Sequence, residues 1–210
     1  MNTRVKFCGM CRPDDARAAA ELGVDAVGVL FYPKSPSAVG METALAISQA
    51  LPPFVELVAL LVNAEPDYVR EVAKQLRPGC LQFHGDEDGD YCRAFDYPYI
   101  KACRVGEKND IAQCVRDFGD ARGILLDAKQ TGYYGGSGKS FDWSLLPNKN
   151  QPPIIVAGGL SADNVGELIS KYRPFAVDVS SGIAKDDDRK IKDHDKMKKF
   201  METVRHANKQ

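Results

Sequence analysis

Eight short apolar runs, separated by segments with helical periodicity, constrain the fold of this chain more than any other feature. The runs span residues 5–8, 25–31, 55–62, 80–84, 99–105, 123–128, 153–158 and 175–180. Their length and β-branched content are typical of buried strands. Most of the intervening segments, such as 12–23, 41–51, 65–76, 110–118 and 161–172, have the apolar period of an amphipathic helix. The sequence therefore predicts strands that alternate with helices.

This alternation indicates parallel pairing of the strands, and eight such units close most simply into a barrel. With 210 residues the chain allows about 26 residues per unit, near the lower size limit of that fold, so the connections must be short. The exception is the span 129–141, after which the sixth helix is reduced to little more than "DWSLL". We predict an α/β fold with one compact (β/α)8 TIM-barrel domain over residues 1–210.

The composition limits the classes of partner. The chain has 28 basic and 29 acidic side chains, and 44% of its residues are hydrophobic. This balance speaks against disorder and against a nucleic-acid partner. The N-terminus lacks the apolar segment of a signal peptide, and no run approaches the roughly 20 apolar residues of a membrane span. We expect a soluble, cytoplasmic protein with no membrane partner.

The six cysteines are few for this length, and most of them are expected to be buried thiols. The stretch "CGMC" (8–11) has the spacing of a zinc or redox motif. A zinc site would need a second ligand pair, which the three isolated histidines do not offer. A redox dithiol would open a helix, but Pro13 indicates that the helix begins later. We therefore expect no metal and no redox role for this motif.

A barrel of this kind builds its active site at the C-terminal ends of its strands, so the polar residues at those ends are the informative ones. They converge on one mouth of the predicted barrel. The set comprises Cys8, Gly9, His84, Arg104, Asp127, Gly158, Gly159, Asp178, Ser180, Ser181 and Gly182.

Several of these segments together resemble the phosphoribosylanthranilate isomerase family over essentially the whole chain. The matching blocks include "KFCGMCRPDDARAAAELGVDAVGVLFYPKSP", "LQFHGDE", "LLDAKQTGYYGGSGKSFDWSLL", "VAGGLSADNV" and "VDVSSGI". The resemblance implies a cofactor-free Amadori rearrangement of N-(5-phosphoribosyl)anthranilate in tryptophan biosynthesis. It also implies a cysteine general base and an aspartate general acid, which match Cys8 and Asp127. The expected partner is the small phosphorylated substrate, and the expected state is a monomer or homodimer.

This chemistry requires an acid and a base that face each other. Opening the aminosugar ring needs a proton on the ring oxygen, and the resulting iminium loses its C2′ proton to a base. Cys8 must be a thiolate to act as that base, so we expect a nearby positive charge, a helix N-terminus or a hydrogen bond from the substrate. The alternative for Cys8 is a small buried hydrophobe, and for Asp127 a helix cap or surface carboxylate.

The ends of the seventh and eighth strands are the usual place for a phosphate in such barrels. Glycines let the backbone approach the anion, and serine hydroxyls add donors. We assign Gly158, Gly159, Ser180, Ser181 and Gly182 to phosphate, with ordinary turn chemistry as the alternative. Asp178, His84 and Arg104 complete the predicted substrate-binding set, although His84 is about equally well explained as a structural histidine.

Two charged or glycine-rich stretches are given other interpretations. "GYYGGSGKS" (132–140) nearly spells a nucleotide-binding loop, but Tyr133 stands where that motif needs glycine, so a mobile active-site loop is preferred. "KDDDRKIKDHDKMKK" (185–199) is interpreted as a solvated loop and helix face.

One position departs from the family pattern. Where the family has "SPR" or "SKR", with an arginine that holds the anthranilate carboxylate, this chain reads "SPS" with Ser37. Either Lys34, another basic residue such as Arg104 or a rearranged loop replaces the arginine, or the carboxylate is held weakly, or the substrate differs. Two alternatives follow: another sugar-phosphate isomerase or aldolase-like barrel, and a non-catalytic scaffold, against which the presence of both Cys8 and Asp127 speaks.

Overall fold

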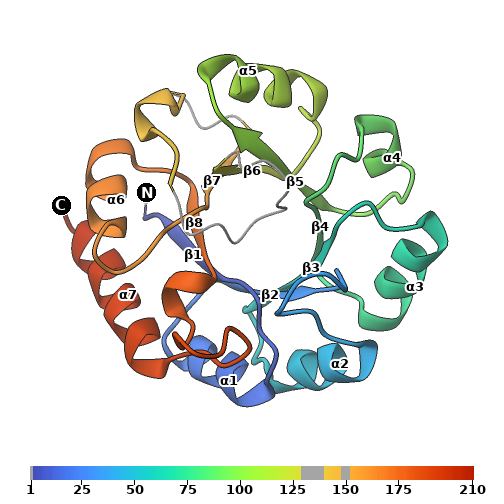
Figure 1. Ribbon diagram of the computed structural model, residues 1–210, viewed down its shortest axis with the longest axis horizontal. Coiled ribbons are helices and arrows are strands. Elements are labelled where there is room, and N and C mark those ends of the chain that lie inside the picture. Colours follow the sequence, from blue (N-terminus) through green and yellow to red (C-terminus); the bar gives the residue numbers. More distant parts are fainter. Residues whose placement is uncertain (1, 129–139, 148–151) are drawn as a thin grey trace.

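The eight predicted strands form a closed parallel barrel in the order β1 to β8 (Figure 1). The computed structural model describes residues 2–128, 140–147 and 152–210. The strand bounds are β1 (Arg4–Phe7), β2 (Ala26–Leu30), β3 (Glu56–Leu61), β4 (Cys80–Phe83), β5 (Tyr99–Val105), β6 (Gly123–Ala128), β7 (Ile154–Val156) and β8 (Ala176–Val179). The prediction of a (β/α)8 barrel is therefore confirmed.

Helices surround the barrel on its outer side, as Figure 1 shows. They are α1 (Pro13–Glu21), α2 (Met41–Ala50), α3 (Pro66–Leu76), α4 (Gly89–Arg93), α5 (Lys108–Asp117), α6 (Val165–Tyr172) and α7 (His194–Ala207). Between β6 and β7 the described residues contain only a single 3₁₀ turn, η1 (Trp143–Leu145), which confirms the reduced sixth helix. A second 3₁₀ turn, η2 (Ser181–Ile183), follows β8.

Alternate residues of the strands fill two separate apolar layers. Side chains on the inner face form one buried cluster, which contains Val58, Cys80, Ile100, Ala102, Leu125, Ile155, Ala157 and Ala176. The other face packs against the helices, for example through Phe7 and Phe200 of α7, whose ring centroids lie 5.8 Å apart. This alternation decides which residues at the strand ends enter the mouth, because Cys8, Arg104 and Asp127 continue the inner face.

The ends of the chain meet where β1 pairs with β8 and closes the barrel. The Thr3 N–H donates to Asn208 Oδ1 at 2.9 Å, and Asn208 Nδ2 donates back to the Thr3 carbonyl at 3.1 Å. A side-chain amide near the end of the chain thus caps the start of the first strand.

The cysteines differ in one respect from the expectation that most are buried thiols. Cys8, Cys80 and Cys92 are buried thiols and Cys11 is a half-buried thiol, but Cys103 and Cys114 form a disulfide. The bond joins β5 to α5, the next element along the chain. Residues 11 apart in sequence and separated by a turn gave no local signal for this pairing.

No helix in the described residues is long and apolar enough to cross a membrane. Those residues also contain no group of three or more His, Cys, Asp or Glu side chains arranged to hold a metal ion.

Candidate active site

Cys8 stands at the end of β1 and points into the barrel mouth. Its N–H donates to the Val179 carbonyl at 2.8 Å, which extends the pairing of β1 with β8 by one residue. The side chain is buried among Leu60 and Val62 of the β3 end, with Leu30 and Tyr32 packed against them. Gly9 follows with φ of 74°, a left-handed conformation that favours glycine, so the chain turns away immediately after the thiol.

Two lysines and one carboxylate surround the Cys8 thiol. Lys6 Nζ donates to Asp178 Oδ1 at 2.9 Å, and both side chains are buried inside the barrel. Burial raises the pKa of Cys8, and the negative charge of Asp178 acts in the same direction. The positive charges of Lys6 and Lys192, together with a hydrogen bond from Lys6, lower this pKa but do not cancel the effect of burial. The charges of the two lysines therefore act in favour of the thiolate form of Cys8.

Asp127 stands at the inner face of β6, which is separated from β1 by the two strands β7 and β8. Its Oδ1 accepts from the Ala128 N–H at 2.8 Å, and its Oδ2 lies 3.4 Å from His84 Nε2. Gln82 Nε2 donates to His84 Nδ1 at 2.9 Å. Because Nδ1 accepts this bond, a neutral His84 carries its hydrogen on Nε2, the nitrogen that faces Asp127. The Gln82–His84 pair thus orients a donor toward the carboxylate.

The turns after β7 and β8 leave backbone donors available at the mouth. Gly158 and Gly159 have φ of 83° and 63°, so both adopt the left-handed conformation. Among the described residues, the N–H groups of Gly159, Ser181 and Gly182 have no hydrogen-bond partner. A Cβ on Gly182 would lie 2.0 Å from the Leu160 carbonyl oxygen, so no other residue fits there without movement of the backbone. Such a turn can accept an anion.

The remaining predicted residues take distinct places. Arg104 lies opposite Asp127 in the pairing of β5 with β6, and its guanidinium forms an ion pair with Asp86. Ser37 is buried, and its Oγ donates to the Arg189 carbonyl at 3.3 Å. Lys34 is exposed. The predicted loop over residues 132–140 lies outside the described residues except for Ser140.

Three residues of the mouth were not predicted from the sequence. Lys6 and Gln82 lie inside strands, where the alternation of inner and outer positions identifies them only once the barrel is assumed. Lys192 lies in the stretch that was interpreted as solvated, but only 2% of its surface is exposed. Its Nζ donates to the Ser180 carbonyl at 3.2 Å and lies 3.4 Å from Ser180 Oγ. That interpretation is wrong for Lys192, because the chain folds back over the end of β8.

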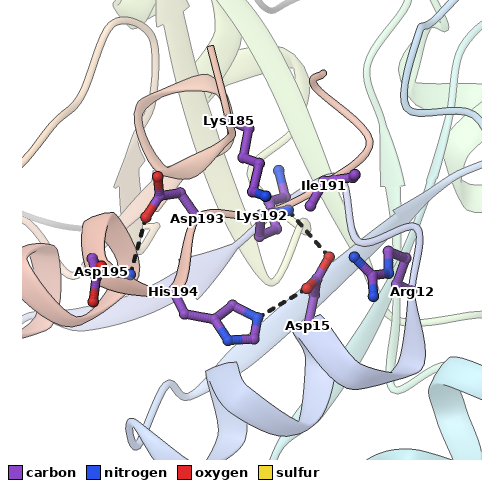
Figure 2. A pocket seen from close by; sticks show the side chains of 8 residues that line it. All are labelled: Arg12, Asp15, Lys185, Ile191, Lys192, Asp193, His194 and Asp195. Atoms are coloured by element: carbon purple, nitrogen blue, oxygen red, sulfur yellow. Dashed lines mark hydrogen bonds and ion pairs between the residues drawn. The ribbon is translucent and has the colours of Figure 1, made fainter. Parts of the chain in front are cut away.

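A pocket of about 360 Å³ lies between the start of α1 and the start of α7 (Figure 2). His194 Nε2 lies 3.0 Å from Asp15 Oδ1, and the Lys192 N–H donates to Asp15 Oδ2 at 3.1 Å. Figure 2 shows that this buried carboxylate ties the two helices together. The residues that line this pocket therefore hold in place the segment that carries Lys192.

The closed barrel, with a thiol, a carboxyl group and a glycine-rich turn at one mouth, has the architecture of the (β/α)8-barrel enzymes. The family model described as N-(5'-phosphoribosyl)anthranilate isomerase matches residues 5–203. The chain belongs to this family, and it is an isomerase.

Individual relatives agree over nearly the full length. The N-(5'-phosphoribosyl)anthranilate isomerase of Pseudomonas savastanoi is 49% identical over 201 residues, which are 96% of this chain and 97% of that protein. The phosphoribosyl anthranilate isomerase structure from Thermotoga maritima has a TM-score of 0.88 and 38% identity, and the match covers 97% of this chain and 99% of that one. A structure of the enzyme in complex with reduced 1-(o-carboxyphenylamino)-1-deoxyribulose 5-phosphate has a TM-score of 0.85 and 36% identity, with the same coverage.

Proposed function

We propose that this chain converts N-(5-phosphoribosyl)anthranilate to 1-(2-carboxyphenylamino)-1-deoxyribulose 5-phosphate in tryptophan biosynthesis, with Cys8 as general base and Asp127 as general acid. One observation carries the assignment of roles. In a chain of this family, Cys8 and Asp127 are the thiol and the carboxyl group at the inner ends of β1 and β6. An acid and a base on different sides of one mouth can act on two atoms of one sugar.

The acid step belongs to Asp127. A proton passes from its carboxyl group to the ring oxygen, the C1′–O bond breaks, and the nitrogen lone pair forms an iminium. His84, 3.4 Å from Asp127 Oδ2, then donates to the carboxylate that the step leaves behind. The Ala128 N–H already binds the other oxygen. Both donors therefore stabilise the charge that develops on Asp127.

The base step belongs to Cys8. Its thiolate removes the C2′ proton of the iminium, and the electron pair of that C–H bond moves to give an enolamine. Proton transfer to C1′ and ketone formation at C2′ then complete the isomerisation. The lysine charges beside Cys8 favour the thiolate form that this step requires.

The phosphate of the substrate is assigned to the turns after β7 and β8. The N–H groups of Gly159, Ser181 and Gly182 supply donors, and Lys192 adds positive charge beside Ser180. Gly158 and the Ser180 hydroxyl complete the cradle. An anion held there is fixed at the opposite end of the sugar from the reacting carbons, which positions them.

The anthranilate carboxylate needs an anchor, because Ser37 replaces the family arginine. Ser37 itself is covered by the Arg189 carbonyl and does not offer this contact. Arg104 stands on the inner face of β5 beside Asp127 and is the better placed of the two cations considered from the sequence. Exposed Lys34 is the other.

Three further expectations belong to this proposal. The substrate is the only small-molecule partner, with no nucleic acid and no membrane involved. The protein acts as a monomer or homodimer in the cytoplasm. If another phosphorylated aminosugar is the true substrate, the reason lies at Ser37, where the family contact is absent.

The deciding experiment follows the loss of substrate fluorescence with purified protein. The wild-type chain should consume N-(5-phosphoribosyl)anthranilate, and no turnover would contradict the proposal. Cys8→Ser raises the pKa of the base far above neutral while it preserves the size, so activity should nearly vanish with little change in thermal stability. Cys11→Ser is the matched control, because the Cys11 thiol lies against the Ser37 carbonyl at 3.4 Å and should be dispensable. An inactive Cys11→Ser beside an active Cys8→Ser would reverse the choice of thiol.

A further inference from the structure

Lys6 is a buried lysine inside the barrel, and the acid–base mechanism above does not name it as a reacting group. It lies on β1, two residues before Cys8 and on the same inner face. Only 4% of its surface is exposed. A buried ammonium is costly without a partner, and Asp178 on neighbouring β8 supplies one at 2.9 Å. The pair is therefore one unit built across the junction that closes the barrel.

Gly28 on β2 provides the space in which Lys6 and Cys8 approach each other. A Cβ on Gly28 would lie 2.8 Å from Cys8 Sγ and 3.2 Å from Lys6 Nζ. The Cys8 sulfur and the Lys6 ammonium thus both lie beside the position that a Cβ on residue 28 would occupy. Glycine, which has no Cβ, leaves this position empty. A residue with a side chain would push them apart.

The charged groups around Cys8 come from three elements. Lys6 lies on its own strand, Asp178 on β8, and Lys192 in the segment between η2 and α7. Lys192 Nζ donates to the Ser180 carbonyl and is directed to the end of β8. The charge of Lys6 lowers the pKa of Cys8 more than the charge of Lys192 does, so Lys6 is the cation with the greater effect on the thiolate.

The protonation state of Lys6 fits this role. Burial alone lowers the pKa of Lys6, but the charges of Asp178 and Cys8 outweigh burial and raise the pKa above its ordinary value. The raised pKa favours the ammonium form of Lys6. An ammonium has no lone pair to accept the substrate proton, so this form acts through its charge.

We propose that Lys6 is a positioning residue of the isomerisation: held by Asp178 in the space that Gly28 leaves, its ammonium stabilises the Cys8 thiolate and fixes Sγ at the barrel mouth. The inference rests on the proposed function only in taking Cys8 as the base. It gives Asp178 a second task beside the substrate contact predicted for it, namely to hold Lys6.

The test measures the acidity of Cys8 directly. The rate of iodoacetamide alkylation at Cys8, followed by peptide mass spectrometry against pH, reports the thiolate fraction without any turnover. In Lys6→Met/Asp178→Asn, which removes the pair without leaving a lone buried charge, the alkylation midpoint should rise, because Lys6 lowers the pKa of Cys8 more than Asp178 raises it. The rising limb of kcat/KM against pH should move with it. Lys6→Arg keeps the charge and should bring the midpoint back toward wild type.

The chain contains a matched control pair. Lys101 and Glu87 form a second buried ion pair at 2.7 Å, on the outer side of the barrel. Lys101→Met/Glu87→Gln should leave the Cys8 midpoint in place, and an equal shift there would overturn the inference, as would an unmoved midpoint in the Lys6 double variant. Activity that persists in Cys8→Ser would instead remove Cys8 as the base, while the alkylation midpoint still decides whether Lys6 controls the thiol.

Discussion

At the scale of single residues, the two thiols of "CGMC" show how strand geometry separates function from packing. Cys8 continues the inner face of β1 and meets Lys6, whereas Cys11 lies beyond the Gly9 turn against the carbonyl groups of Gly9 and Ser37. The two cysteines are only three positions apart in the sequence. The choice between them follows from the alternation of side chains along a strand, which places Cys8 in the mouth.

Asp127 can be tested by a change that keeps its shape. Asp127→Asn still occupies the space beside His84 but cannot deliver a proton to the ring oxygen. We expect kcat to fall by roughly 10² or more, with little change in substrate binding. Steady-state kinetics with a product-analogue binding assay measure the two effects separately. A kcat close to wild type would move the acid to another residue.

Arg104 can be tested as the carboxylate anchor. The anthranilate carboxylate is remote from the reacting carbons, so its contact should contribute equally to ground state and transition state. Arg104→Ala should raise KM by about tenfold or more while kcat changes little, since a hydrogen bond to a charged group is worth about 1.5–3 kcal/mol. Lys34→Ala is the exposed control. A raised KM in the Lys34 variant alone would transfer the role to Lys34.

At the scale of elements, the two 3₁₀ turns and the segment after β8 decide most of what surrounds the site. Residues 185–199 were expected to form a solvated loop and helix face, because the stretch is highly charged and opens with six consecutive charged side chains from Lys185 to Lys190. Those residues are exposed, but the bridge between Ala184 and Lys192 folds the segment back on itself. The density of charged residues thus predicted which part of the segment is exposed. The burial of Lys192 depends on the contact with Ala184, which the sequence pattern does not indicate.

Gly182, in the 3₁₀ turn η2, is the position in these turns with the clearest steric requirement for glycine. In Gly182→Ala the new methyl group would meet the Leu160 carbonyl oxygen at 2.0 Å, so the turn after β7 or η2 must move. We expect the free energy of unfolding to fall by about 1–3 kcal/mol and KM to rise, because both turns belong to the proposed phosphate cradle.

Gly40→Ala is the control for this change, since a Cβ at Gly40 meets no atom within 4 Å. Urea unfolding and KM should both stay near wild type in that variant. An unchanged KM in Gly182→Ala, together with a clear loss of stability, would show that this turn does not bind the substrate phosphate.

At the scale of the whole molecule, the fold could be predicted because its signal repeats eight times. Each apolar run and each amphipathic segment adds the same information, so an error in one unit does not alter the architecture. The Cys8 and Asp127 pair could be predicted because strand ends define the mouth. Lys192 and the Cys103–Cys114 bond could not, because each depends on one contact that no local pattern encodes.

The two hydrogen bonds between Thr3 and Asn208 hold the two ends of the chain side by side. The barrel is thus closed by non-covalent contacts between the first and the last units, and not by a peptide connection. A circular permutant should therefore fold when a short glycine-rich linker joins the present ends and new ends open between Pro53 and Phe54. That site lies in the exposed connection from α2 to β3, at the face of the barrel opposite the mouth. We expect kcat/KM within several-fold of the parent.

A permutant opened between Lys190 and Ile191 should fold less well and lose activity, because it cuts the segment that brings Lys192 to Ser180. Equal activity of the two permutants would show that the mouth does not depend on that segment.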